Sequence, residues 1–207
     1  QNARELFESY LESVFGNLRE GWEVKKLGEV LRRTETTNPT QNPDRQFVYV
    51  DVSSVDNKRL VIEKTTLLKG ADAPSRARKL IKSGDVIFAT VRPTLRRIAV
   101  VSEEYDGQVC STGYFVLRAK EQINSRMLFY FLQTSSFNQN MEKLQKGASY
   151  PAVTDADVRE QIINFPRSLN EQIAIVAKLD ALSAETKKLE AMYKKKLTAL
   201  DELKKSI

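Results

Sequence analysis

The sequence predicts an α+β fold, in which a globular domain with a mixed or antiparallel sheet follows a short helix and precedes one long helix. Three observations predict it. Residues 3–15 and 170–207 carry apolar side chains at helical spacing. Residues 22–169 instead contain short β-rich runs separated by turn residues. Strands and helices do not alternate regularly along the chain, so the sequence does not indicate a parallel, nucleotide-binding sheet.

The first helix is expected over residues 3–15, within an N-terminal segment that spans residues 1–21. Its apolar side chains lie three and four residues apart, on one face of a helix. They are Leu6, Phe7, Tyr10, Leu11, Val14 and Phe15. Gly16 and Asn17 form a natural stop for the helix. This stripe is exposed on an isolated helix and therefore needs a packing partner.

Residues 22–169 are assigned to the globular domain. Its strands are expected over the β-rich runs 47–55, 59–64, 85–92, 97–103 and 113–119. A helix is expected over the first half of residues 125–143. Residues 155–163 are expected to form a short helix that leads into a strand. The single tryptophan, Trp22, is expected to anchor the core where the first helix meets the domain; stacking on a base is the alternative.

Residues 170–207 are expected to form one long helix, because neither Gly nor Pro interrupts them. Side chains at a three-four alternation give it a coiled-coil seam. The seam consists of Leu179, Leu182, Thr186, Leu189, Tyr193, Lys196, Leu200, Leu203 and Ile207. Its apolar members are the candidate dimerisation residues. A helix of roughly 57 Å is marginal alone, so two interpretations stay open: the seam buries against another long helix, or the helix folds back on its own domain.

The two ends of the chain share a short pattern. Residues 5–10 read ELFESY and residues 202–207 read ELKKSI, so both follow Glu-Leu-x-x-Ser-apolar. If the two helices are equivalent, the chain is one unit of a larger repeat. The long helix would then continue into a further unit or a missing tail, which explains why no stop signal ends it. So short a match can also arise by chance.

Composition narrows the chemistry. The chain has no histidine and one cysteine, Cys110. These counts exclude His-based or thiolate zinc sites, Ser-His-Asp triads and an internal disulfide framework. No phosphate-binding loop and no carboxylate pattern of a nuclease is visible, so we expect no catalytic residues, no metal and no cofactor. A lone cysteine suits a reducing cytoplasm, and no apolar run is long enough to span a membrane.

The charge distribution favours an anionic partner. The net charge is +6, and residues 71–100 hold seven basic side chains against two acidic ones. Such an excess favours a polyanion, although a solvated charged surface explains it as well. Nucleic-acid recognition needs Lys and Arg on phosphates for affinity, and Arg, Asn, Gln, Ser or Thr at base edges for specificity.

Two segments supply both kinds of residue. In residues 90–97, Pro93 predicts a turn with arginines projecting around it. In residues 145–151, Gly147 lets the backbone approach a ligand closely. The basic run 76–79 is a third candidate, expected to face phosphates. The candidate DNA-binding residues are Arg76, Arg78, Thr90, Arg92, Thr94, Arg96, Arg97, Lys146, Ser149 and Tyr150. Surface arginines balanced by nearby acids, and an ordinary turn before a strand, are the alternatives for the two segments.

Five stretches carry a family resemblance. They are GWEVKKLGEV (21–30), SGDVIFATVRPTLRRIAVV (83–101), GASYPAVTDADVREQIINFP (147–166), NEQIAIVAKLDAL (170–182) and ALDELKKSI (199–207). Together they resemble the specificity subunit of Type I restriction-modification enzymes. The most specific part is the join between Pro166 and the long helix, with Glu171 and Gln172 following the proline at a fixed distance.

The resemblance implies a role in DNA recognition. In that family a full subunit has two target-recognition domains, each reading one half of a split site in double-stranded DNA, and two long helices that pair antiparallel. This chain matches one recognition domain (22–169) and one conserved-region helix (170–207). It therefore resembles the C-terminal half of a subunit, or a natural half-subunit that forms a homodimer.

The resemblance also implies that methylation and cleavage belong to partner subunits. Modification (methyltransferase) subunits would dock on the long helices, and restriction (translocase and nuclease) subunits would join the complex. Two other classes stay open. One is a non-catalytic helical scaffold or adaptor whose α+β domain binds protein, and the other is an enzyme that uses carboxylates.

Overall fold

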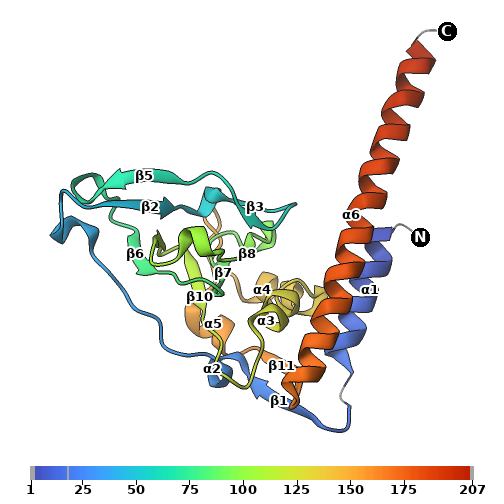
Figure 1. Cartoon of the computed structure of the whole chain (residues 1–207), viewed down its shortest axis with the longest axis horizontal. Coiled ribbons are helices and arrows are strands. Elements are labelled where there is room, and N and C mark those ends of the chain that lie inside the picture. The colour runs from blue at the N-terminus through green and yellow to red at the C-terminus, as the bar shows by residue number, and fades with distance from the viewer. Residues whose placement is uncertain (1–2, 18, 206–207) are drawn as a thin grey trace.

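A computed structural model describes residues 3–17 and 19–205 of the chain (Figure 1). Its helices are α1 (Ala3–Gly16), α2 (Leu27–Val30), α3 (Ser125–Phe131), α4 (Ser135–Leu144), α5 (Asp155–Arg159) and α6 (Leu169–Lys205). Its strands are β1 (Trp22–Lys26), β2 (Gln46–Val50), β3 (Val55–Asp56), β4 (Val61–Ile62), β5 (Thr66–Lys69), β6 (Ala77–Leu80), β7 (Val86–Ala89), β8 (Ile98–Val100), β9 (Val109–Ser111), β10 (Tyr114–Leu117) and β11 (Ile162–Pro166). Within the described ranges, no helix is long and apolar enough to cross a membrane.

The strands form two larger sheets. β10, β7 and β8 make an antiparallel sheet whose central strand, β7, is buried over its whole length. The second sheet has the order β5-β2-β9-β6 and is mixed, because β2 and β9 are parallel while the outer pairs are antiparallel. β1 pairs with β11, and β3 with β4. Mixed sheets between a short N-terminal helix and a long C-terminal helix confirm the predicted α+β class.

The strands are shorter and more numerous than predicted. The run 47–55 divides into β2, a 3-10 turn at Val52–Ser54 and the start of β3. The sequence did not predict four of the strands, β1, β5, β6 and β9. β6 carries two basic side chains that obscure its pattern, and it pairs with β9 across a register shift. The second half of 125–143 is also helical, because the Thr134 hydroxyl caps α4 by accepting from the backbone N–H of Phe137.

The main hydrophobic core joins α1 to the domain. Leu11, Val14 and Phe15 of α1 are buried, in the same cluster as side chains of α3, β7 and α6. The apolar stripe of α1 thus has its partner within the chain, except at Leu6, which is 54% exposed. Trp22 is 7% exposed and its Nε1 donates to Glu171 Oε1 at 3.2 Å, which confirms it as a core anchor.

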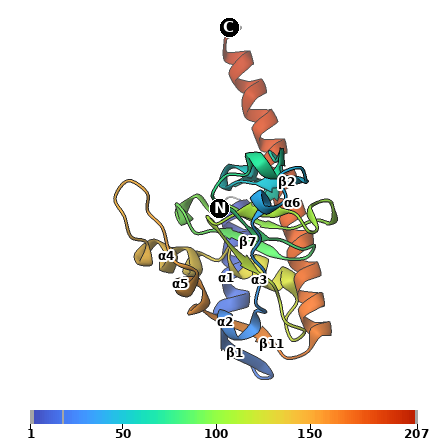
Figure 2. The same ribbon diagram turned by 90° about the vertical axis from the view of Figure 1, so that its left-hand side faces the viewer.

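The two halves of α6 have different surroundings (Figures 1 and 2). The first half packs beside α1 and α3. There Gln172 is fully buried: its side chain accepts from the backbone of Asn124 at 2.7 Å and donates to the carbonyl of Pro166 at 2.8 Å. Beyond Thr186 the helix leaves the domain, and every side chain from 187 to 202 is exposed. The long helix therefore folds back on its own domain over its first half only.

The candidate dimerisation residues divide accordingly. Leu179 is fully buried and Leu182 half-buried, so packing within the chain accounts for both, and neither belongs to a free surface. The exposed members are Leu189, Tyr193 and Leu200. The side chain of Leu203, and the whole of Ile207, lie outside the described residues.

Candidate nucleic-acid interface

The two predicted recognition segments lie next to each other in space. We call residues 90–97 the arginine loop and residues 145–151 the glycine loop. The backbone N–H of Arg92 donates to the carbonyl of Pro151 at 2.7 Å, and that of Val153 donates to the carbonyl of Thr90 at 3.0 Å. A short ladder therefore holds the two loops together. Figure 2 shows the chain between α4 and α5, which contains the glycine loop, projecting from the body of the molecule.

The arginine loop is a strained turn. Pro93–Leu95 form a 3-10 turn, as the proline predicts, and Arg92 and Arg96 on either side have φ angles of 50° and 51°. For residues other than glycine, this left-handed conformation costs roughly 1–2 kcal/mol each. The Asn57 side chain steadies the turn by donating to the carbonyl of Leu95 at 3.1 Å. Backbone strain that is held by its surroundings in this way gathers at functional sites.

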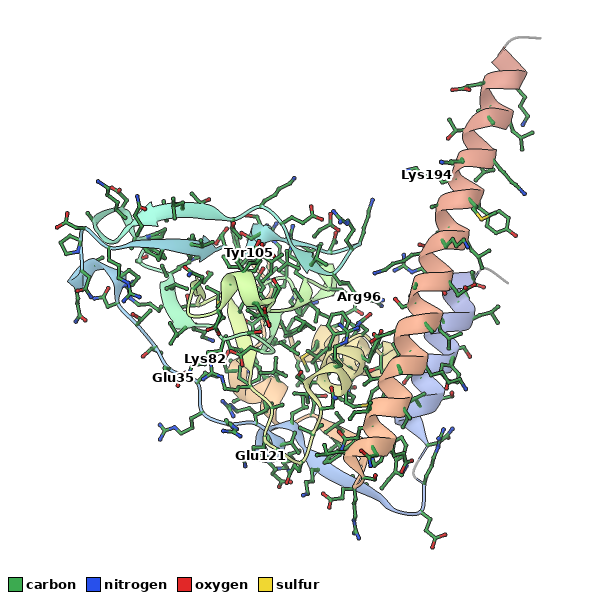
Figure 3. The ribbon with its side chains drawn as sticks, in the orientation of Figure 1. Glu35, Lys82, Arg96, Tyr105, Glu121 and Lys194 are labelled. Atoms are coloured by element: carbon green, nitrogen blue, oxygen red, sulfur yellow. The ribbon has the colours of Figure 1, made fainter. Side chains whose placement is uncertain are left out.

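Arg92, Thr94 and Arg96 are the predicted recognition residues of the arginine loop that reach its surface, where Leu95 is exposed as well. Arg92 and Thr94 are exposed, and the guanidinium of Arg92 lies 4.9 Å from the centroid of the Tyr150 ring. Arg96 is half-buried, with Nη1 3.9 Å from Glu8 Oε1 of α1. Figure 3 shows Arg96 on the side of the domain that faces the long helix. Arg92 and Thr94 are thus the more accessible side chains.

Arg97 and Thr90 have structural partners instead. The guanidinium of Arg97 is half-buried and donates to the carbonyls of Val52 and Val55, at 3.2 and 2.8 Å. Arg97 therefore does not project from the turn as the sequence predicts, because these carbonyls hold its donors. Thr90 is buried, and its hydroxyl donates to the carbonyl of Gly113 at 3.1 Å.

The glycine loop closes on itself. Lys146 and Ala152 exchange two backbone hydrogen bonds of 2.9 Å. Gly147 has a φ angle of 97°, and a Cβ there would lie 2.9 Å from the carbonyl oxygen of Tyr150. The glycine thus allows close approach of the loop's own backbone, where the sequence predicts approach to a ligand. Lys146, Ser149 and Tyr150 are all exposed, so the three predicted side chains reach solvent.

The two arginines at the start of β6 differ in accessibility. Arg76 is exposed, and its carbonyl accepts from the backbone of Thr112 at 2.8 Å. The neighbouring Gly113 carbonyl accepts from the backbone of Thr90 at 2.8 Å, so this turn connects Arg76 to the arginine loop. Arg78 is half-buried, and its Nη1 donates to the carbonyl of the preceding residue at 2.8 Å.

One segment of this region escaped the sequence analysis. The turn between β3 and β4 contacts the arginine loop through the hydrogen bond from Asn57 to the carbonyl of Leu95, and the next residue, Lys58, is exposed. Its signal is Asp56, whose Oδ1 accepts from the backbone of Lys58 and Arg59 at 2.8 and 2.7 Å. An Asx turn of this kind is visible in a sequence, but its neighbours in space are not.

The surface offers recognition groups. The described residues include no group of three or more His, Cys, Asp or Glu side chains placed to hold a metal ion. Burial raises the pKa of the Cys110 thiol to about 12, so the thiol stays protonated near neutral pH. The two loops present cations, hydroxyls and an aromatic ring, which are the groups that contact phosphates and base edges.

Comparisons with known sequences identify relatives. Residues 19–199 match the family model described as the Type I restriction modification DNA specificity domain. The chain is 24% identical over 164 residues to the Type I restriction enzyme HindI specificity subunit of Haemophilus influenzae, covering 77% of this chain and 35% of that protein. It is 23% identical over 182 residues to the MjaVIII specificity subunit of Methanocaldococcus jannaschii, covering 84% and 42%.

Solved structures share the fold. The HsdS subunit from Thermoanaerobacter tengcongensis superposes with a TM-score of 0.77 at 45% identity, covering 89% of this chain and 48% of that one. A chain from a structure on assembly and conformational transition of the type I R-M system gives 0.80 at 44% identity, with coverages of 89% and 48%. This chain spans less than half the length of each of these four relatives. Because the family model matches residues 19–199, the chain belongs to the family of Type I restriction modification DNA specificity domains.

Proposed function

We propose that this chain is a non-catalytic module that recognises one half of a bipartite site in double-stranded DNA. The observation that carries the proposal is the backbone ladder that places the arginine loop and the glycine loop side by side. The predicted recognition residues whose side chains are exposed on the two loops are Arg92, Thr94, Lys146, Ser149 and Tyr150. Membership of the DNA specificity family supports the proposal.

Affinity and specificity have different sources on this surface. Lys146 is expected to contact phosphate, since an exposed ammonium group attracts the backbone of any sequence. Arg92 is expected to reach a base edge, because a guanidinium can donate two parallel hydrogen bonds to one base. The hydroxyls of Thr94 and Ser149 suit either target.

A mobility-shift titration with random-sequence duplexes, over a salt series, tests this function. We expect the logarithm of the binding constant to fall linearly with the logarithm of the salt concentration. Lys146→Ala should weaken binding to all duplexes alike and reduce the salt slope by about one. Arg92→Ala should weaken binding by about 1–3 kcal/mol, and only for duplexes that carry the base pair that Arg92 contacts. The proposed surface would be contradicted if the chain bound no duplex at low salt. It would also be contradicted if both variants kept the affinity of the unmodified chain and its order of preference among the duplexes.

We also propose that the exposed half of α6 binds protein partners. A second long helix, from another copy or from another part of a longer chain, would set the spacing between half-sites. Modification and restriction subunits would assemble on the paired helices. The apolar side chains exposed beyond Thr186 support this role.

Truncation of the long helix tests partner docking. Removing residues 187–207 leaves the packed half of α6 in place, and should abolish co-purification with a cognate methyltransferase subunit. Arg92→Ala is the matched control, since it alters the DNA surface alone and should leave co-purification unchanged. Retention of the methyltransferase subunit by the truncated chain would place the docking surface elsewhere.

A further inference from the structure

Arg92 and Tyr150 form a cation–π pair across the two loops. The guanidinium of Arg92 lies over the ring of Tyr150, 4.9 Å from its centroid, which is within cation–π distance. Tyr150 is 68% exposed, and Arg92 is exposed as well. Within the described part of the chain, Arg92 has no carboxylate partner, whereas Arg96 lies near Glu8. The charge of Arg92 is therefore free to act on a ligand.

The backbone fixes both members of the pair. The N–H of Arg92 donates to the carbonyl of Pro151, the residue after Tyr150, at 2.7 Å. Gly147 has no Cβ, and this allows the tight fold in which its α-carbon approaches the Tyr150 carbonyl. Arg92 itself has a φ angle of 50°, so the chain leaves its extended direction at this residue. These features set where the side chains of Arg92 and Tyr150 leave the backbone.

A guanidinium over a ring keeps its donor edge available. Stacking uses the face of the guanidinium plane, whereas bidentate hydrogen bonding uses its edge. The ring also limits the conformations that the Arg92 side chain would lose on binding DNA, and this favours binding. In the major groove, guanine presents two neighbouring acceptors that match the guanidinium edge.

We propose that Tyr150 is a positioning residue that holds Arg92 for bidentate recognition of a guanine, so that the pair specifies one G·C base pair of the half-site. The inference rests on the proposed function, because it requires that this surface reads DNA. It goes further in assigning the specificity at one base pair to a ring that acts through its neighbour. A ring that stacked on a base directly would have a different signature, since stacking tolerates any sequence.

The test begins with the full chain and a duplex library that has a randomised window. Each base pair of the selected site is then changed singly, and binding is measured at two salt concentrations. We expect the unmodified chain to prefer guanine at one position by about 5- to 150-fold. Arg92→Lys keeps the charge but loses the planar fork, so it should abolish that preference without changing the salt slope.

The decisive comparison is between two variants of Tyr150, one without the ring and one that keeps it. Tyr150→Ala should reduce the preference at the position read by Arg92 and at no other, while Tyr150→Phe should retain it. Combined with Arg92→Lys, Tyr150→Ala should have no further effect at that position, because the two side chains act as one unit. Both side chains are exposed, so the variants should keep the thermal midpoint of the unmodified chain.

The outcomes separate this inference from the proposed function. If Tyr150→Ala leaves the preference intact, or weakens all duplexes alike, the ring does not act through Arg92 and the inference is wrong. Loss of the preference in Tyr150→Phe would also overturn it, since the ring remains. A chain that binds no duplex at all would overturn the proposed function, and the inference with it.

Discussion

Single residues of the candidate interface differ in whether their polar groups already have partners within the chain. Thr90 donates to the Gly113 carbonyl, and Arg97 donates to the carbonyls of Val52 and Val55. Removing such a donor costs stability, whereas removing an exposed cation costs binding. A variant that binds DNA weakly therefore has to be compared with the unmodified chain in stability before its effect is assigned to contact.

Arg97→Ala should lower the free energy of unfolding by about 1–3 kcal/mol, because the carbonyls of Val52 and Val55 lose a charged donor. Chemical denaturation measures this difference. Arg76→Ala is the matched control, since an exposed arginine should change stability by no more than about 0.5 kcal/mol. Equal stability of the two variants would mean that water replaces the Arg97 guanidinium as donor to these carbonyls. Arg97 would then again be a candidate for contact with DNA.

Glu35 connects the segment after α2 to residues that follow β6 and β10. It accepts from Arg118, which also pairs with the buried Asp85 at 2.9 Å. It also accepts from Lys82 at 3.1 Å, and Figure 3 shows these two residues close together. The hydrogen bond from Arg118 is the main cause that lowers the pKa of Glu35 from 4.5 to about 2. A carboxyl group whose pKa is lower in the folded chain than in the unfolded chain makes its full contribution to stability at pH values above the unfolded pKa. It loses this contribution as the pH falls through the folded value.

Glu35→Gln should therefore be less stable than the unmodified chain above pH 4.5, and the gap should narrow as the pH falls toward about 2. Thermal melts of both chains across this range measure the gap. Glu142→Gln, at an exposed position of α4, is the control and should show no comparable change. A gap that is constant with pH would show that packing, and not the charge of Glu35, causes the loss.

Among the elements, a polar clamp ties α6 to α3. Asp180 of α6 accepts from the hydroxyl of Tyr130 and from the guanidinium of Arg126. Tyr130 is 2% exposed, and its burial together with the hydrogen bond to Asp180 raises the pKa of its hydroxyl. Phe7 of α1 packs edge-on against the same ring, with centroids 6.4 Å apart. One carboxylate thus sits where three helices meet.

Asp180→Ala should destabilise the fold by about 1–3 kcal/mol, because the buried hydroxyl of Tyr130 loses its acceptor. Adding Tyr130→Phe should recover part of the loss, since no unsatisfied hydroxyl then remains. Urea denaturation measures both effects. Asp201→Ala, exposed on the same helix, should change stability by no more than about 0.5 kcal/mol. If Asp180→Ala matched that control, the clamp would not stabilise the meeting of the helices.

Elements with several apolar repeats were predictable, and short elements were not. α1 and α6 span 14 and 37 residues, so their periodicity is repeated several times. β6 and β9 have four and three residues, too few for a pattern, and they become strands by pairing with each other. The Pro93 turn was predictable because proline restricts its own backbone. The ladder between the two loops was not, because it joins segments that are distant in the chain.

Viewed as a whole molecule, the chain connects the two proposed recognition loops and the proposed partner surface through one domain. The first half of α6 belongs to the main core, whereas the second half extends beyond the domain (Figures 1 and 2). The apolar side chains exposed on that second half are Leu189, Met192, Tyr193, Leu197 and Leu200. Met192 and Leu197 make this stripe wider than the predicted seam. A partner bound to the stripe would therefore fix the orientation of the two proposed recognition loops.

We expect the chain to associate with itself through this stripe when no other partner is present. Leu189→Asp combined with Leu200→Asp should give a monomer, because each carboxylate would be buried without a counter-charge. Ala191→Asp combined with Thr198→Asp is the control, since it adds the same charge to the opposite face of the helix. Sedimentation equilibrium at several protein concentrations measures the result.

The two double variants distinguish a contact through the stripe from a general effect of added negative charge. A monomeric unmodified chain, or loss of association in both variants, would contradict the contact. The first half of α6 stays packed in either variant, so each should still bind a duplex that carries one half-site. Only the stripe variant should lose the gain in affinity for a duplex with two correctly spaced half-sites, because that gain requires two recognition domains held at a fixed distance.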